Sequence, residues 1–200
     1  MSYFKEKLKN AICNNDIEFL ENNKNRYSIN ERFEDEDNET LLLYSISDKE
    51  SITYKFFLEN NADISFVNNE NENIFHAIVY SGDIDRLIEI LSFYNNININ
   101  ARANDGSTPL LLSLSLENFE MAKVFIHQGA DVNIGDINDI TPLHLAVQFG
   151  DLDLVKLLIS NGSNYKKKTL KGNYPLALAV NADKDDIVKY LYSKIYIKEL

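Results

Sequence analysis

The sequence lacks the features of a secreted or membrane-spanning protein. Its single cysteine, Cys13, excludes an intramolecular disulfide framework and is compatible with a reducing compartment. The first seven residues include the charged Lys5, Glu6 and Lys7 and contain no apolar signal-peptide stretch. No run approaches the roughly 20 apolar residues that cross a bilayer. We therefore expect a soluble, cytoplasmic protein.

Positive charge is also scarce, with 20 Lys and Arg against 31 Asp and Glu and a net charge of -11. Nucleic-acid binding depends on Lys and Arg neutralising phosphates, so this balance argues against a nucleic acid or an anionic membrane as the partner. The charge is uneven: Glu31–Glu72 carries twelve acids and three bases, whereas Ser163–Leu200 carries eight bases and four acids. An acidic body can steer a basic protein, or simply keep the chain soluble.

Signatures of catalysis and metal binding are missing as well. There is no phosphate-cradling loop with lysine and no Gly-x-Ser-x-Gly motif. His127 has no cysteine or histidine at ligand spacing, and Cys13 is expected to be a small buried hydrophobe. The acidic run from Glu34 to Asp37 lacks the alternating ligands and the central glycine of a calcium loop. We expect no enzyme activity, cofactor, metal or small-molecule substrate.

The main positive feature is a motif that recurs every 33 to 35 residues. Successive copies read Thr40-Leu-Leu-Leu43, Asn73-Ile-Phe-His76, Thr108-Pro-Leu-Leu111, Thr141-Pro-Leu-His144 and Tyr174-Pro-Leu-Ala177. A sixth, degenerate copy begins near Glu6. Five registers near one period indicate that the whole chain is built from repeats.

Each position of the best copy has a physical role. Thr141 is expected to cap a helix and Pro142 to occupy its first position, where the missing N–H costs nothing. Ala146 is small enough for neighbouring helices to approach, and Gly150 ends the helix by permitting a positive φ. An outer helix follows, with an expected apolar face of Leu152, Leu154, Val155, Leu157, Leu158 and Ile159.

Several copies depart from this pattern. Asn15 and Asn61 tolerate the left-handed conformation, whereas Lys49 and Glu117 replace glycine at the break between helices and predict slightly strained turns. The third copy carries about two extra residues around Ser92–Asn96. Polar residues are expected to cap both ends of the array: Lys5, Glu6, Lys9 and Asn10 in the first copy, and Lys184, Asp185, Asp186 and Lys189 in the last.

The unit resembles the ankyrin repeat, and the resemblance covers essentially the whole chain. It implies an all-α solenoid of about six stacked helix–turn–helix units with projecting hairpin-like fingers, in one domain over residues 1–200. The approximate repeats are 1–37, 38–70, 71–105, 106–138, 139–171 and 172–200. In the family's motif, the histidine slot filled by His76 and His144 ties adjacent repeats through hydrogen bonds, so we expect structural roles for both residues.

The resemblance also implies a partner-binding surface on the concave side, formed by inner helices and fingers. Variable positions before each break between helices are expected to face it. The candidate residues are Asp48, Tyr80, Ser81, Ser115, Leu116, Gln148 and Phe149, together with Glu34, Asp35, Glu36 and Asp37 of the acidic first finger. Exposed large side chains at such positions are typical of binding hot spots. The alternative is that Tyr80, Leu116 and Phe149 pack against the fingers.

Three functions remain open on the sequence. The first is a protein-interaction module whose partner is another protein and which is a monomer when free. The second is an acidic immunity protein, antitoxin or inhibitor that neutralises a basic enzyme. The third is an effector of a pathogen or virus that acts inside a host cell.

Overall fold

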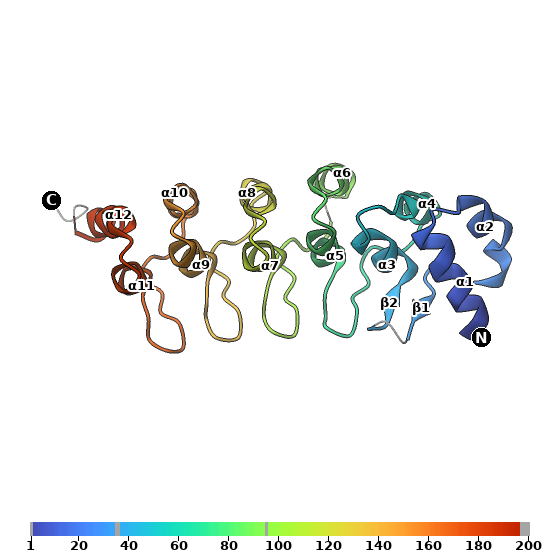
Figure 1. Cartoon of the computed structure of the whole chain (residues 1–200), viewed down its shortest axis with the longest axis horizontal. Coiled ribbons are helices and arrows are strands. Elements are labelled where there is room, and N and C mark those ends of the chain that lie inside the picture. Colours follow the sequence, from blue (N-terminus) through green and yellow to red (C-terminus); the bar gives the residue numbers. More distant parts are fainter. Residues whose placement is uncertain (1, 35–36, 95, 197–200) are drawn as a thin grey trace. The chain divides into compact units, whose positions relative to one another are not determined.

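The computed structural model describes residues 2–34, 37–94 and 96–196, and short helices follow one another in pairs throughout this part of the chain (Figure 1). The helices are α1 (Ser2–Cys13), α2 (Ile17–Asn22), η1 (Lys24–Arg26, a 3-10 turn), α3 (Leu41–Ser47), α4 (Thr53–Glu59), α5 (Ile74–Ser81), α6 (Ile84–Phe93), α7 (Pro109–Ser115), α8 (Phe119–His127), α9 (Pro142–Phe149), α10 (Leu152–Ser160), α11 (Pro175–Asn181) and α12 (Asp185–Tyr196). The strands β1 (Arg32–Phe33) and β2 (Glu39–Thr40) form an antiparallel pair within the first finger. The predicted all-α repeat architecture is confirmed.

The chain divides into two compact units, Met1–Asn104 and Asp105–Leu200. The division falls next to the boundary predicted between the third and fourth repeats. Unit 1 contains α1 to α6 and unit 2 contains α7 to α12. In unit 2 the inner helices α7, α9 and α11 form one row, the outer helices α8, α10 and α12 form a second row, and the fingers project beyond the inner row (Figure 1). The organisation as a single domain stays a prediction.

The predicted helix starts and stops are present. Thr108 caps α7, because its hydroxyl oxygen accepts the Leu111 amide at 3.3 Å, and Pro109 follows at the first helical position. Gly150 ends α9 with a φ of 80°. Glu117 adopts the same left-handed conformation with a φ of 57°, which costs a residue with a side chain more than it costs glycine. The strained turn predicted at Glu117 is therefore observed.

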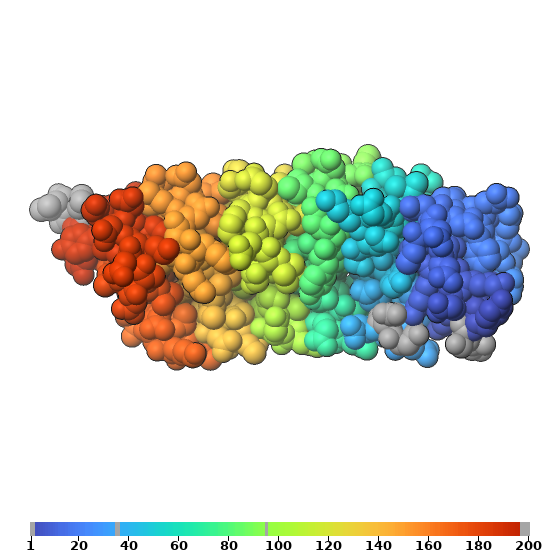
Figure 2. Space-filling model, in the orientation of Figure 1, coloured from blue at the N-terminus to red at the C-terminus, as the bar shows by residue number. Residues whose placement is uncertain are grey.

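Burial follows the 33-residue period in unit 2. Leu110 and Leu143 are almost fully buried at equivalent positions, as are Leu114 and Val147. Ala146 is fully buried between neighbouring helices, as its size predicted. Within unit 2, Figure 2 shows successive repeats as adjoining bands of surface.

Two predictions about individual side chains are wrong. Cys13 is exposed at the end of α1, with its sulfur 3.7 Å from the Tyr44 hydroxyl, rather than buried. Lys9 is 9% exposed, because its ammonium lies over the Phe33 ring at 5.1 Å, and so it is not part of a polar end surface. On the predicted apolar face of α10, Leu154, Val155 and Leu158 are fully buried, whereas Leu152, Leu157 and Ile159 are half-buried.

Backbone hydrogen bonds join successive fingers within each unit. In unit 1 the Asn69 amide donates to the Asp37 carbonyl and the Asn104 amide to the Glu70 carbonyl, each at 2.8 Å. In unit 2 the Ile137 amide donates to the Asp105 carbonyl at 2.9 Å, and the Leu170 amide donates to the Asn138 carbonyl at 2.8 Å. These bonds hold each finger beside the next, although the fingers contain little regular strand.

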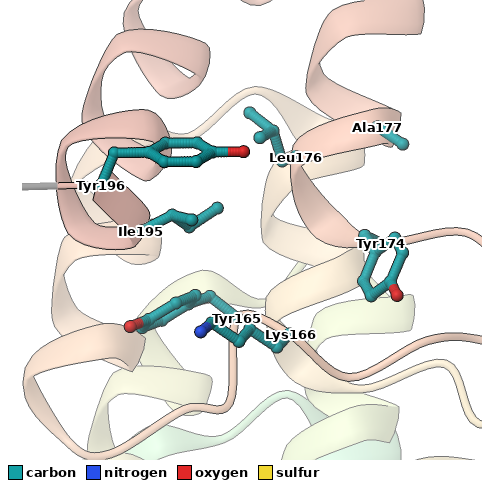
Figure 3. Close-up of a pocket in the computed structure, with 7 residues that line it drawn as sticks. All are labelled: Tyr165, Lys166, Tyr174, Leu176, Ala177, Ile195 and Tyr196. Carbon is teal, nitrogen blue, oxygen red and sulfur yellow. The ribbon is translucent and has the colours of Figure 1, made fainter. Parts of the chain in front are cut away.

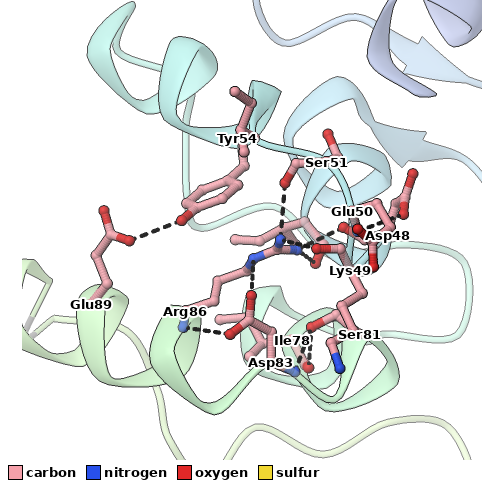
Figure 4. Close-up of polar contacts among 12 residues, drawn as sticks. Asp48, Lys49, Glu50, Ser51, Tyr54, Ile78, Ser81, Asp83, Arg86 and Glu89 are labelled. Atoms are coloured by element: carbon pink, nitrogen blue, oxygen red, sulfur yellow. Dashed lines mark hydrogen bonds and ion pairs between the residues drawn. The ribbon is translucent and has the colours of Figure 1, made fainter. Parts of the chain in front are cut away.

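The turn between α3 and α4 is built differently from the others. None of residues 47–52 has a positive φ, so Lys49 does not take the place of a left-handed glycine. The turn is instead held by Arg86 of the following repeat, which is 3% exposed. Its guanidinium donates to four backbone carbonyls, those of Ile46 (2.6 Å), Asp48 (2.8 Å), Lys49 (2.9 Å) and Ser51 (2.9 Å) (Figure 4).

Two further groups position the Arg86 guanidinium. The carboxylate of Asp83 lies 3.5 Å from its Nε, and the Tyr54 ring lies 4.5 Å from its Cζ. The Tyr54 hydroxyl donates to Glu89 at 2.8 Å (Figure 4). Burial, together with that bond, raises the pKa of Tyr54 above its ordinary value. A buried cation is tolerated here because each of its two terminal nitrogen atoms donates to two carbonyls, and the Asp83 carboxylate supplies an opposite charge.

We expect Arg86→Met to destabilise unit 1 by about 3–5 kcal/mol, since the change leaves four carbonyls and the Asp83 carboxylate without their cation. Arg86→Lys should recover only part of this loss, because an ammonium lacks the planar fork that reaches several carbonyls at once. Urea denaturation followed by circular dichroism measures both. Arg102→Met, at an exposed arginine of the same unit, is the control. An Arg86→Met midpoint equal to that of the control would contradict the proposed role of the guanidinium.

Candidate partner-binding surface

The candidate residues before the breaks between helices lie in both units, and each unit is described by itself. In unit 1, Tyr80 is 51% exposed at the end of α5, and its hydroxyl donates to Glu72 of the adjoining finger at 2.5 Å. Asp48 is half-buried, and its carboxylate accepts the Glu50 amide at 3.0 Å. Both side chains reach the surface, but each is held by a local bond.

Ser81 is a correction to the predicted surface. It is 6% exposed, because its hydroxyl turns back to donate to the Ile78 carbonyl at 2.7 Å and accepts the Asp83 amide at 3.2 Å. These bonds close the turn between α5 and α6. A buried hydroxyl that already makes both of these hydrogen bonds is not available to a partner.

In unit 2 the candidate side chains at the corresponding helix ends are more exposed to solvent. Ser115 and Gln148 are exposed, and Leu116 is 51% exposed. Phe149 is half-buried, because its ring packs edge-on against Phe119 at the start of α8, with the ring centroids 5.3 Å apart. Phe149 thus packs against an outer helix, which is neither the free exposure expected for it nor the alternative of packing against a finger. We call Ser115, Leu116, Gln148 and Phe149 the unit 2 inner surface.

The acidic first finger is described only in part. Glu34 and Asp37 are exposed, whereas Asp35 and Glu36 lie outside the described residues. Asp37 has a φ of 48°, and its carbonyl is the one that accepts the Asn69 amide. The base of this finger is fixed by Arg32, which donates to the Asn38 and Val67 carbonyls at 3.1 and 3.2 Å.

Both motif histidines are buried, and the predicted hydrogen bond to the next repeat is observed for His144. The Nδ1 atom of His144 accepts the Thr141 amide at 3.1 Å, and its Nε2 lies 3.2 Å from the Asn173 carbonyl of the next finger. This pattern assigns the ring proton to Nε2, which donates to Asn173. His76 is fully buried and forms the equivalent capping box with Asn73. His144 thus ties one repeat to the next.

Among the described residues, no three or more His, Cys, Asp or Glu side chains gather where they could hold a metal ion. Within the same part of the chain, no helix has both the length and the apolar character to span a membrane.

A cavity lies at the last repeat, where no pattern in the sequence predicted one. Its volume is about 430 Å³, and we call it the terminal pocket (Figure 3). Ile195 and Tyr196 approach from α12, and Leu176 and Ala177 from α11. Tyr165, Lys166 and Tyr174 of the preceding loop complete its lining. The polar cap predicted for the last repeat, Lys184, Asp185, Asp186 and Lys189, lies at the start of α12 or just before it and does not line this cavity.

Burial lowers the pKa of His144 below its ordinary value of 6.5. Below about pH 6.5 the unfolded chain takes up a proton at this position that the folded chain does not, so stability falls as the pH falls, until the folded pKa is reached. We expect wild type to lose up to about 1.4 kcal/mol per pH unit in this window relative to His144→Gln. Urea titrations at several pH values measure it, with the exposed His127→Gln as control. Parallel pH profiles for wild type and His144→Gln would contradict a buried, neutral ring.

Comparison with known proteins agrees with this geometry. A model of ankyrin repeats matches residues 52–136, 75–169 and 134–199. An ankyrin repeat protein of Acanthamoeba polyphaga mimivirus is 29% identical over 93 residues, which are 46% of this chain and 12% of that protein. An ankyrin repeat protein of fowlpox virus is 28% identical over 90 residues, 44% of this chain and 26% of that one.

Neurogenic locus notch homolog protein 1 of Homo sapiens is 33% identical over 102 residues, which cover 51% of this chain and 4% of that protein. The chain thus spans about a quarter or less of the length of these relatives. The family model, in contrast, accounts for well over half of the chain. The chain belongs to the ankyrin-repeat family.

Proposed function

We propose that this chain is a non-enzymatic interaction module that binds a partner protein through its inner-helix ends and fingers. Ankyrin repeats are generally protein–protein interaction modules. The observation that carries the proposal is the unit 2 inner surface. Leu116, the residue that caps the C-terminus of α7, is half exposed, although Leu110 and Leu114 within α7 are completely buried. Folding of the repeat gives no reason for a leucine at that position.

The neighbours of Leu116 support a binding role. Phe119, three residues later in the sequence, packs against Phe149 of the next repeat, so the turn after Leu116 leads into a pair of aromatic rings. Ser115 and Gln148 add exposed hydrogen-bonding groups at the ends of α7 and α9. An apolar centre with a polar rim is the usual composition of a protein interface. Such a surface binds a protein in preference to a nucleic acid or a membrane.

A second candidate function rests on the acidic segment of unit 1. Its exposed Glu34 and Asp37 belong to a stretch with twelve acids and three bases, which favours a basic partner. An immunity protein, antitoxin or inhibitor that covers a basic enzyme would use this segment. Two of the similar proteins belong to viruses, which is compatible with an effector that acts in a host cell. We further propose that the free chain is monomeric and cytoplasmic.

We expect Leu116→Ala to weaken partner binding by about 2 kcal/mol, as removal of a central anchor does, and Tyr80→Ala and Phe149→Ala to weaken it less because their side chains already have internal contacts. The partner comes from affinity capture on native lysate, and calorimetry gives the affinities. Lys156→Glu on the outer helix α10, where the lysine pairs with Asp153 at 3.3 Å, is the control.

Charge reversal at Glu34 and Asp37 separates the two candidate functions. For a basic partner it should slow association and reduce the salt dependence of binding, with little change in dissociation. Wild-type affinity in Leu116→Ala, Tyr80→Ala and Phe149→Ala, with loss of affinity in Lys156→Glu, would place the working surface on the outer helices and contradict the proposal.

A further inference from the structure

The terminal pocket lies apart from the unit 2 inner surface and has the composition of a buried interface. Leu176 occupies the position that Leu110 and Leu143 hold in the two preceding repeats. Those leucines are at most 1% exposed, whereas Leu176 is half-buried and lines the cavity. Val180, on the same helix, is 53% exposed, although its equivalents Leu114 and Val147 are fully buried. The described residues therefore leave open an apolar surface of the kind that neighbours cover elsewhere in unit 2.

Aromatic side chains form much of the remaining wall. Tyr196 is 52% exposed and stacks with Tyr192 at a centroid distance of 4.4 Å. Tyr165 lies across the cavity, as Figure 3 shows, and is fixed because its hydroxyl donates to the Lys194 carbonyl at 3.2 Å. Tyrosines held in this way offer a large apolar contact area at a small entropic cost. The cavity volume of about 430 Å³ falls within the range of ligand-binding pockets.

The electrostatic surroundings of the pocket favour anions. Lys166 lines the cavity, and the Lys168 ammonium lies 4.8 Å from the ring of Tyr174, another lining residue. The sequence contains no Asp or Glu from Leu154 to Ala182. Asp185 and Asp186 begin α12, about 15 Å along the helix from Ile195. Residues 154–182 therefore contain no carboxylate that could offset the positive charge of Lys166 and Lys168.

From these observations we propose that the terminal pocket is a second docking site, which takes an acidic segment of a partner protein. An apolar side chain of that segment inserts between Leu176 and Tyr196, and flanking carboxylates lie against Lys166 and Lys168. Two lysines on a chain with a net charge of -11 are too few to hold a nucleic-acid backbone, which favours a peptide instead. The site is independent of the unit 2 inner surface and of its partner.

Fluorescence anisotropy with three labelled decapeptides tests the proposal on the full chain. The first has a central Leu-Phe pair flanked by Asp and Glu, the second has Lys in place of the acids, and the third has Ala in place of the Leu-Phe pair. We expect the first to bind, and the other two to bind at least about tenfold more weakly. Lys166→Glu and Tyr196→Ala should each weaken the first peptide about tenfold as well. High salt should weaken it further.

Matched controls connect the result to the pocket. Lys156→Glu and Leu116→Ala should bind the first peptide like wild type, so failure of this site is distinguishable from failure of the inner surface. Circular dichroism melts show whether each variant is folded. Leu176→Glu is the second pocket variant if Tyr196→Ala unfolds the last repeat.

Three outcomes would overturn the proposal. One is that none of the peptides binds, and a second is that the lysine or alanine peptide binds as well as the acidic one. The third is that the free protein self-associates in sedimentation and that Leu176→Glu abolishes this, since the pocket would then belong to a second copy of the chain.

Discussion

A helix pair of about 33 residues cannot bury the apolar faces of its own helices, so each repeat depends on its neighbours. In unit 2 this constraint accounts for the full burial of Leu110, Leu143, Ala146 and Val147. It also limits which surfaces can bind a partner, because the packed faces of the inner helices are buried between repeats. What remains for a partner is the last turn of each inner helix and the finger that follows an outer helix. The exposure of Leu116 is informative because Leu110, Leu111 and Leu114 of the helix that it caps are buried.

Neighbouring repeats are joined by hydrogen bonds between particular groups as well as by apolar packing. The His144 ring reaches the Asn173 carbonyl of the next finger, and backbone bonds such as Leu170 to Asn138 join finger to finger. In unit 1, Arg86 of one repeat holds the turn of the repeat before it. A polar group of one repeat thus completes the backbone of another, and stability passes between neighbours through hydrogen bonds of fixed geometry.

The sequence predicted the repeat period, the helix caps and the left-handed turns, because these depend on residues close together in the chain. It did not predict the role of Arg86, because the carbonyls that Arg86 binds lie 35 to 40 residues earlier. No sequence motif identifies a backbone carbonyl as a hydrogen-bond partner. Ser81 and Phe149 were placed on the right helix ends, but a hydroxyl bond back to Ile78 and a ring contact with Phe119 decide their exposure. Such one-residue differences depend on packing between elements, which spacing alone does not reveal.

The most direct test of the inner-helix ends and fingers as the working surface is amide hydrogen exchange of the full chain with and without its captured partner. The account predicts slower exchange at residues 112–118 and 145–151 and in the adjoining fingers. Exchange along the outer helices α8 and α10 should stay unchanged. Protection confined to α8 and α10, with 112–118 and 145–151 exchanging as in the free protein, would contradict it.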